Sequence, residues 1–137
     1  MKKRLTAVIG FVIVTALLVS CRTTGVLNIT NQPIPVYEST RLTVGQVRQA
    51  ILDAGKERGW IMSDVNSNQI KAVLDKRNTQ AVVLINYNSQ NYSINYSNSI
   101  NLEYNGTSIN RHYNDWVTYL SRSIDFNLAK IAQKVNN

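Results

Sequence analysis

The sequence contains one cysteine, one histidine and two prolines in 137 residues. A single cysteine excludes an intramolecular disulfide, and a single histidine leaves a transition-metal site with only carboxylates as further ligands. The eight Asp and Glu residues show no close carboxylate pair suited to general acid and base chemistry. We therefore predict no metal, no cofactor and no catalytic residue.

A serine hydrolase is the enzymatic alternative to this prediction. His112 could pair with Ser121 or Ser123, and Asp115 or Asp125 could orient it. The sequence lacks the Gly-x-Ser-x-Gly turn that exposes many such nucleophiles, and nothing in it places His112 against either aspartate. We interpret His112 as a surface or helix-start residue.

The amino-terminal segment combines positive charge with an apolar run. Lys2, Lys3 and Arg4 precede the run Leu5 to Val19. Fifteen residues fall short of the roughly 20 that a helix needs to cross a bilayer core. The pattern predicts a secretory signal peptide at residues 1–20.

The only cysteine, Cys21, follows Leu18, Val19 and Ser20 directly. This arrangement resembles a bacterial lipobox. The resemblance implies that the thiol of Cys21 carries a diacylglyceryl group, that the signal is removed before it, and that its amino group is acylated, for example with palmitate. Two acyl chains would anchor the protein essentially permanently. The alternative is a buried free cysteine near the end of a membrane helix.

Arg22 and the remaining charges bear on location. In bacterial lipoproteins an aspartate after the cysteine favours the inner membrane, so Arg22 implies the outer membrane, with the domain facing the periplasm.

The net charge of the chain after removal of the signal peptide is +4, because without Lys2, Lys3 and Arg4 it has twelve basic and eight acidic residues. This charge is mild and scattered, and we expect no nucleic-acid partner.

The mature segment is long enough for one small domain. We predict an extended tether at residues 21–40, because it contains Pro33 and Pro35 and no helical period, and a single domain at residues 41–137. Within the tether, Ile34–Glu38 could add an edge strand, where proline is tolerated.

Two helices are expected at the ends of the domain. Thr43 and Gln46 fit a capping box, Leu42 and Val47 fit a hydrophobic staple, and Gly59 is a natural terminator. A long helix is expected from about residue 108 to 135. Its apolar stripe is predicted at Tyr113, Trp116, Val117, Leu120, Ile124, Leu128, Ile131 and Val135.

Between the helices the apolar period changes to two, which predicts strands with one buried face. The predicted inward residues are Ile70, Ala72 and Leu74; Ala81, Val83, Ile85 and Tyr87; Tyr92, Ile94 and Tyr96; and Ile100, Leu102 and Tyr104. Short asparagine-rich turns favour an antiparallel meander. The predicted fold is α+β, a two-layer arrangement of four to five antiparallel strands with two helices on one face.

Five stretches of the sequence resemble a family of small proteobacterial outer-membrane lipoproteins of unknown function. They are "RGW" (58–60), "IKA" (70–72), "VVLINY" (82–87), "YSINYSNSINLEY" (92–104) and "HYNDWVTYLSRSI" (112–124). The order of helix, meander and long helix is loosely similar to the helix-grip domains of lipoprotein component C of the outer-membrane β-barrel assembly machine. Neither resemblance implies a catalytic residue, and similarity of fold does not imply similarity of function.

The residues between the inward ones predict a polar, nearly uncharged outer face that could bind a ligand. The predicted residues of this face are Lys71, Val82, Leu84, Asn86, Ser93, Asn95, Asn101 and Glu103. Apolar Val82 and Leu84 suggest that the tether or a partner covers part of it. A solvated sheet face is the alternative. Separately, "EYNGT" (103–107) resembles a bacterial N-glycosylation sequon at Asn105.

We therefore expect a membrane-anchored periplasmic lipoprotein that acts as a non-enzymatic binding or adaptor module and has an envelope protein as its partner. A module that binds peptidoglycan or lipopolysaccharide is the second alternative, and an envelope hydrolase is the third.

Overall fold

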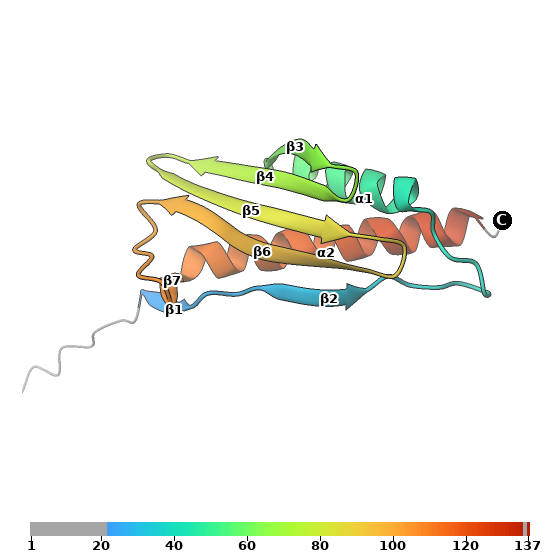
Figure 1. Ribbon diagram of the computed structural model, residues 1–137, viewed down its shortest axis with the longest axis horizontal. Coiled ribbons are helices and arrows are strands. Elements are labelled where there is room, and N and C mark those ends of the chain that lie inside the picture. Colours follow the sequence, from blue (N-terminus) through green and yellow to red (C-terminus); the bar gives the residue numbers. More distant parts are fainter. Residues whose placement is uncertain (1–21, 136) are drawn as a thin grey trace, which may run out of the picture.

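A computed structural model describes residues 22–135 and residue 137 (Figure 1). The predicted signal peptide and Cys21 lie outside the described residues. The elements follow in the order β1 (Thr23–Gly25), β2 (Ile29–Pro33), α1 (Val44–Glu57), β3 (Ile61–Asn66), β4 (Gln69–Lys76), β5 (Thr79–Tyr87), β6 (Asn91–Ile100), β7 (Ser108–Asn110) and α2 (Arg111–Val135).

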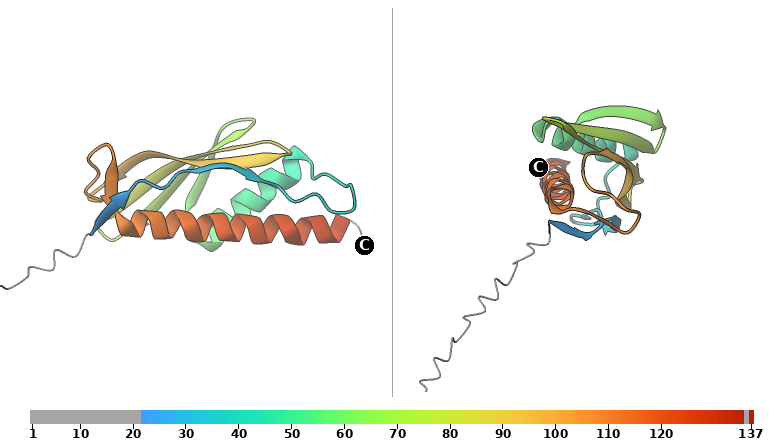
Figure 2. Two further views of the ribbon diagram at one scale, coloured as in Figure 1. Left: turned by 90° about the horizontal axis from the view of Figure 1, so that it is seen from below. Right: turned by 90° about the vertical axis from the view of Figure 1, so that its left-hand side faces the viewer.

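The main sheet has five antiparallel strands in the order β2-β6-β5-β4-β3. Strands β3 to β6 form a meander, and β2 joins it beside β6. Both helices lie against the same face of this sheet (Figure 2). Strands β1 and β7 form a separate two-stranded sheet. The predicted two-layer α+β fold is confirmed.

Helix α1 begins and ends with the predicted signals. The Gln46 N–H donates to Thr43 Oγ1 at 3.2 Å, and the Thr43 N–H donates to Gln46 Oε1 at 2.9 Å, which completes the capping box. At the other end Gly59 has a φ of +79°. The Trp60 N–H donates to the Gly55 carbonyl at 2.8 Å and the Gly59 N–H to the Lys56 carbonyl at 3.1 Å, the two bonds of a Schellman motif.

Helix α2 begins at Arg111, three residues later than predicted, because residues 108–110 pair with β1 as strand β7. Its stripe is buried at Tyr113, Val117, Leu120, Ile124 and Leu128. The predicted stripe is wrong at its margins. Trp116 and Ile131 are only partly buried, and Val135 is 45% exposed.

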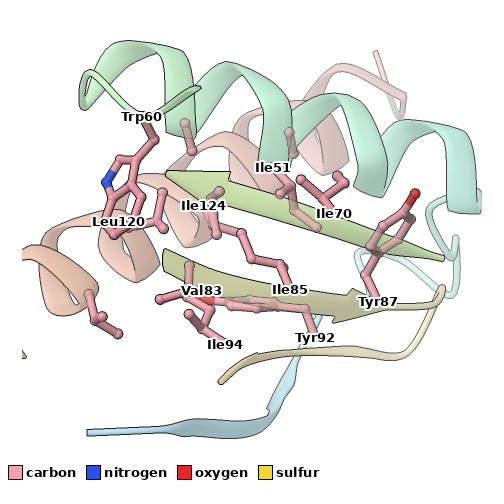
Figure 3. Packing of buried hydrophobic residues seen from close by; sticks show 14 of the residues in the cluster. Ile51, Trp60, Ile70, Val83, Ile85, Tyr87, Tyr92, Ile94, Leu120 and Ile124 are labelled. Carbon is pink, nitrogen blue, oxygen red and sulfur yellow. The ribbon is translucent and has the colours of Figure 1, made fainter. Parts of the chain in front are cut away.

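The core lies between the sheet and the helices (Figure 3). The inward residues of β4 and β5 are buried as the alternation predicted, and so are Tyr92 and Ile94 of β6. Trp60 is also buried, with 4% of its surface exposed. Burial of alternate residues fixes the register, because a shift by one residue would move every apolar side chain to the other face.

The edge strand lies earlier than predicted. Strand β2 occupies residues 29–33, whereas residues 34–38 follow it outside any named strand. Ile29 pairs with Ile94, and Pro33 ends the strand opposite Asn91. Proline therefore closes the strand instead of lying within it, which agrees with its missing N–H.

The predicted separation of the strand with Tyr96 from a strand with Ile100 is also wrong, because β6 continues without a break to Ile100. Val83 pairs with Tyr96 and Val82 with Asn98, so Ser97 is an extra residue opposite the same stretch of β5. This bulge shifts the alternation by one residue. No strand follows over residues 101–104. Ile100 and Tyr104, both predicted to be inward, are 50% and 43% exposed.

Candidate binding surfaces

The outer sheet face is the surface of the five-stranded sheet that points away from the two helices. Six of the eight residues predicted for this face lie on its strands, in cross-strand pairs that include Lys71 with Leu84 and Asn86 with Ser93. Lys71 and Asn86 are exposed, whereas Leu84 is partly buried. The tether does not lie across this face, because its strand β2 joins the edge of the sheet beside β6.

An apolar row crosses the outer sheet face perpendicular to the strands. Ile61 of β3 pairs with Val73 of β4, and Val73 pairs with Val82 of β5. Exposure falls along the row, from 65% for Ile61 to 6% for Val82. Ile100 of β6 is 50% exposed and pairs with Gln80, two residues before Val82 on β5. Ile100 is therefore a diagonal neighbour of Val82 on the same face. The sequence pattern did not reveal this row, because Val73 and Ile61 had no predicted role.

Asn101 and Glu103 do not lie on the outer sheet face. They follow the bulged end of β6, and each has a φ of 54°, in a loop rather than a strand. The Nδ2 of Asn101 donates to the Asn78 carbonyl at 2.7 Å, which ties this loop to the β4–β5 turn.

The loop that contains Asn101 and Glu103 encloses an open hollow of about 580 Å³. Tyr96 and Tyr104 stack in its wall with ring centroids 4.3 Å apart. The remaining lining is mostly serine and asparagine. In the same loop Asn105 Oδ1 accepts hydrogen bonds from the backbone N–H groups of residues 107 and 108, so the predicted sequon lies in a tight turn.

Two further hollows adjoin each other around Trp116 on α2. One, of about 190 Å³, is lined by Arg58, Trp60, Leu74 and Tyr119, and the other, of about 310 Å³, lies against the β4–β5 turn. Both are also lined by Lys76 and Trp116. We call the two together the Trp116 groove. The sequence analysis assigned Trp116 to the buried stripe of the last helix and so missed this groove.

A polar cluster lies between β6 and α2. The buried Tyr92 hydroxyl donates to Asp125 Oδ1 at 2.8 Å and lies 2.8 Å from Ser121 Oγ. Gln32 Nε2 donates to Asp125 Oδ2 at 3.3 Å. Burial raises the pKa of Asp125, and these two hydrogen bonds oppose the rise. Burial also raises the pKa of Tyr92. The cluster joins the tether strand to α2.

The candidate hydrolase residues do not converge. His112 Nδ1 lies 4.0 Å from Asp115 Oδ2, and both side chains are largely exposed. Ser121 contacts Tyr92, and Ser123 Oγ accepts a hydrogen bond from Arg58 Nε at 2.7 Å. Each serine therefore has a structural partner other than His112. Within the described residues no group of three or more His, Cys, Asp or Glu side chains could hold a metal ion.

Neither helix of the described residues is long and apolar enough to cross a membrane. Comparisons with protein-family models, with curated proteins and with solved structures found no match. The resemblances to the lipoprotein family and to the helix-grip domains therefore remain predictions.

Proposed function

We propose that this chain is a lipoprotein of the bacterial outer membrane, anchored through Cys21, and that it acts in the periplasm as a non-enzymatic module that captures an envelope protein on its outer sheet face. The lipobox pattern supports the anchor. The separation of His112 from Ser121 and Ser123 supports a binding role over hydrolysis.

The single observation that carries the proposed partner site is the apolar row of Ile61, Val73 and Val82. It begins at β3, which is the edge strand of the sheet. On its outer side β3 pairs with no strand of the described residues, so its backbone N–H and C=O groups on that side are available to an added strand. A protein can use both features at once, because an extended segment adds backbone hydrogen bonds while its side chains cover the row.

Glycan binding is the second candidate, and the loop hollow favours it. Tyr104 presents a partly exposed aromatic ring beside asparagine and serine side chains. Amides and hydroxyls both donate and accept hydrogen bonds, as the hydroxyl groups of a sugar require. This hollow lies at the end of β6, away from Ile61 at the β3 edge, so the two candidates can be tested separately.

Site-specific crosslinking in cells tests the protein-capture proposal. A photo-reactive residue at Ser63, which is exposed on β3, should yield one discrete crosslinked protein of the envelope. The variant Ile61→Arg should abolish this product, because a charge placed on a 65% exposed side chain disrupts docking without emptying the core.

Phe126→Arg is the matched control, since Phe126 is 68% exposed and lies on α2, in the layer on the other side of the sheet. It should leave the crosslinked product unchanged. A product that persists in Ile61→Arg, or that forms equally from a photo-reactive residue at Arg122 on α2, would reject the outer sheet face as the capture site.

A further inference from the structure

We propose that the Trp116 groove holds the phosphate-bearing headgroup of an anionic phospholipid in the membrane to which the chain is anchored. The proposal rests on lipidation at Cys21 and assigns a second membrane contact to the folded domain. It is independent of the protein partner proposed for the outer sheet face.

The charge of the groove is of one sign. Arg58, Lys76 and Arg77 line it, and none of its lining residues is acidic. Within residues 22–135, neither Lys76 nor Arg77 has a carboxylate within ion-pair distance. Asp75, the acidic residue next to Lys76 in sequence, accepts a hydrogen bond from Gln80 at 2.8 Å instead. Two carboxylates, Asp115 and Glu103, contact the lining residues His112 and Asn110 at the other side of the groove. The part of the groove formed by Arg58, Lys76 and Arg77 therefore favours an anion.

Arg58 is held in place before any ligand arrives. Its Nε donates to Ser123 Oγ at 2.7 Å, and its guanidinium carbon lies 5.7 Å from the centre of the Tyr119 ring. Because these contacts fix the side chain, less conformational entropy is lost when its remaining N–H groups bind a phosphate oxygen.

The floor of the groove is apolar and aromatic. Trp116 is partly buried and stacks on His112 with ring centroids 6.2 Å apart, and Leu74 and Leu102 are each only 2% exposed. Tryptophan favours the interface between headgroups and acyl chains, where one part of the ring is apolar and the N–H is hydrated. An inorganic phosphate ion would leave this floor uncovered, whereas the glycerol and upper acyl carbons of a lipid would cover it.

The groove lies at the end of the domain where the anchor would attach. The Arg111 N–H donates to the Arg22 carbonyl at 2.9 Å, and Thr23 pairs with Asn110. Asn110 and His112 line the larger hollow. The start of β1, the start of α2 and the β4–β5 turn lie together at the left end of the molecule in Figure 1. Cys21 immediately precedes Arg22, so lipidation would bring this end to the bilayer surface.

Both tryptophans of the chain, Trp60 and Trp116, line the groove, so its fluorescence can be measured without a label. The acylated full chain is reconstituted into phosphatidylcholine vesicles in which about 30% of the lipid carries a spin label on its headgroup, enough to give an anionic surface where that lipid is anionic. The labelled lipid is phosphatidylglycerol in one preparation and phosphatidylcholine in the other. We expect stronger quenching of tryptophan with phosphatidylglycerol, and the difference should disappear at about 1 M salt, where the screening length falls to about 3 Å.

Charge reversal by Lys76→Glu with Arg77→Glu should abolish the phosphatidylglycerol-dependent quenching, because each basic residue contributes about fivefold to attraction at an anionic surface. Lys130→Glu with Lys134→Glu is the control, since it changes the net charge equally at the far end of α2. An equal loss of quenching in both double variants would overturn the proposal. Quenching that does not depend on phosphatidylglycerol would overturn it as well. A chain that leaves the vesicles in a high-salt wash would instead show that the anchor is wrong.

Discussion

At the scale of single residues, Tyr113 and Tyr92 make a contrasting pair. Both are fully buried, but the Tyr92 hydroxyl has protein partners, whereas the Tyr113 hydroxyl has no hydrogen-bond partner among the described residues. A buried unpaired polar group costs about 1–3 kcal/mol. We expect Tyr113→Phe to raise the free energy of unfolding by about 1 kcal/mol, and Tyr92→Phe to lower it by about 1–3 kcal/mol. Denaturant titration measures both, and a destabilised Tyr113→Phe variant would contradict this account.

A second residue-scale prediction concerns the carboxyl group of Asp125. Its folded-state pKa lies above its unfolded value, so relative to the neutral variant Asp125→Asn the wild-type chain is most stable below the usual aspartate pKa of about 3.9. The advantage is lost as the pH rises through the raised pKa. Unfolding titrations of both proteins between about pH 3 and pH 7 should show this decline. An advantage that grows with pH would mean that the folded state favours the charged carboxylate.

At the scale of elements, α1 contains two glycines, Gly55 and Gly45, for which we expect substitution by alanine to have different effects on stability. A Cβ on Gly55 would lie 2.6 Å from Met62 Cε and 2.7 Å from Met62 Cγ, whereas a Cβ on Gly45 meets only Thr43 Oγ1 at 3.9 Å. Gly55→Ala should therefore force the flexible Met62 side chain into another conformation, at a cost of about 1 kcal/mol that removes the gain in helix propensity. Gly45→Ala should instead stabilise α1 by about 0.5–1 kcal/mol.

The thermal midpoints of the two variants and of Met62→Ala test this explanation. If the contact with Met62 is the cause, Gly55→Ala should cost less in a Met62→Ala background than alone, which appears as a coupling energy in a double-mutant cycle. Additive effects would place the cost elsewhere in the helix.

The elements also show what sequence reasoning could and could not reach. The capping box at Thr43 and the buried alternation of β4 and β5 depend on local chemistry and period, and both were predicted. The bulge at Ser97 was not, because one extra residue changes the phase without changing composition. The residues of β7 were assigned to the last helix, because these three residues form a strand only by pairing with β1, which is distant in the sequence. The Trp116 groove was not predicted, because apolar periodicity does not distinguish a partly buried tryptophan from a fully buried one.

At the scale of the whole molecule, the proposed anchor is the feature that decides where the domain acts. We expect Cys21→Ala to leave the precursor without lipid and to remove the acyl contribution to membrane affinity, about 0.8 kcal/mol for each buried methylene. Mass spectrometry of the purified protein and fractionation after a high-salt wash measure the two effects. A variant that matures to the same mass and stays in the membrane would refute lipidation at this residue.

The short pairing of β1 with β7 also sets the reach of the domain. While Thr23, Thr24 and Gly25 stay paired, Arg22, the residue after the proposed attachment point, is held at the start of α2, and lipidation at Cys21 would keep the body of the molecule close to the membrane. Release of those three pairs would free residues 22–25, which fully extended span roughly 14 Å. Beyond them the chain stays attached, because the Leu27 N–H donates to Asn114 Oδ1 at 2.9 Å and Asn28 Oδ1 accepts from the Tyr96 N–H at 2.8 Å. Thr23, Thr24 and Gly25 are exposed whereas Ile109 of β7 belongs to the core, so the β1 side of this ladder can separate while β7 stays packed. The length of those few residues would then set how far the domain can move from the membrane.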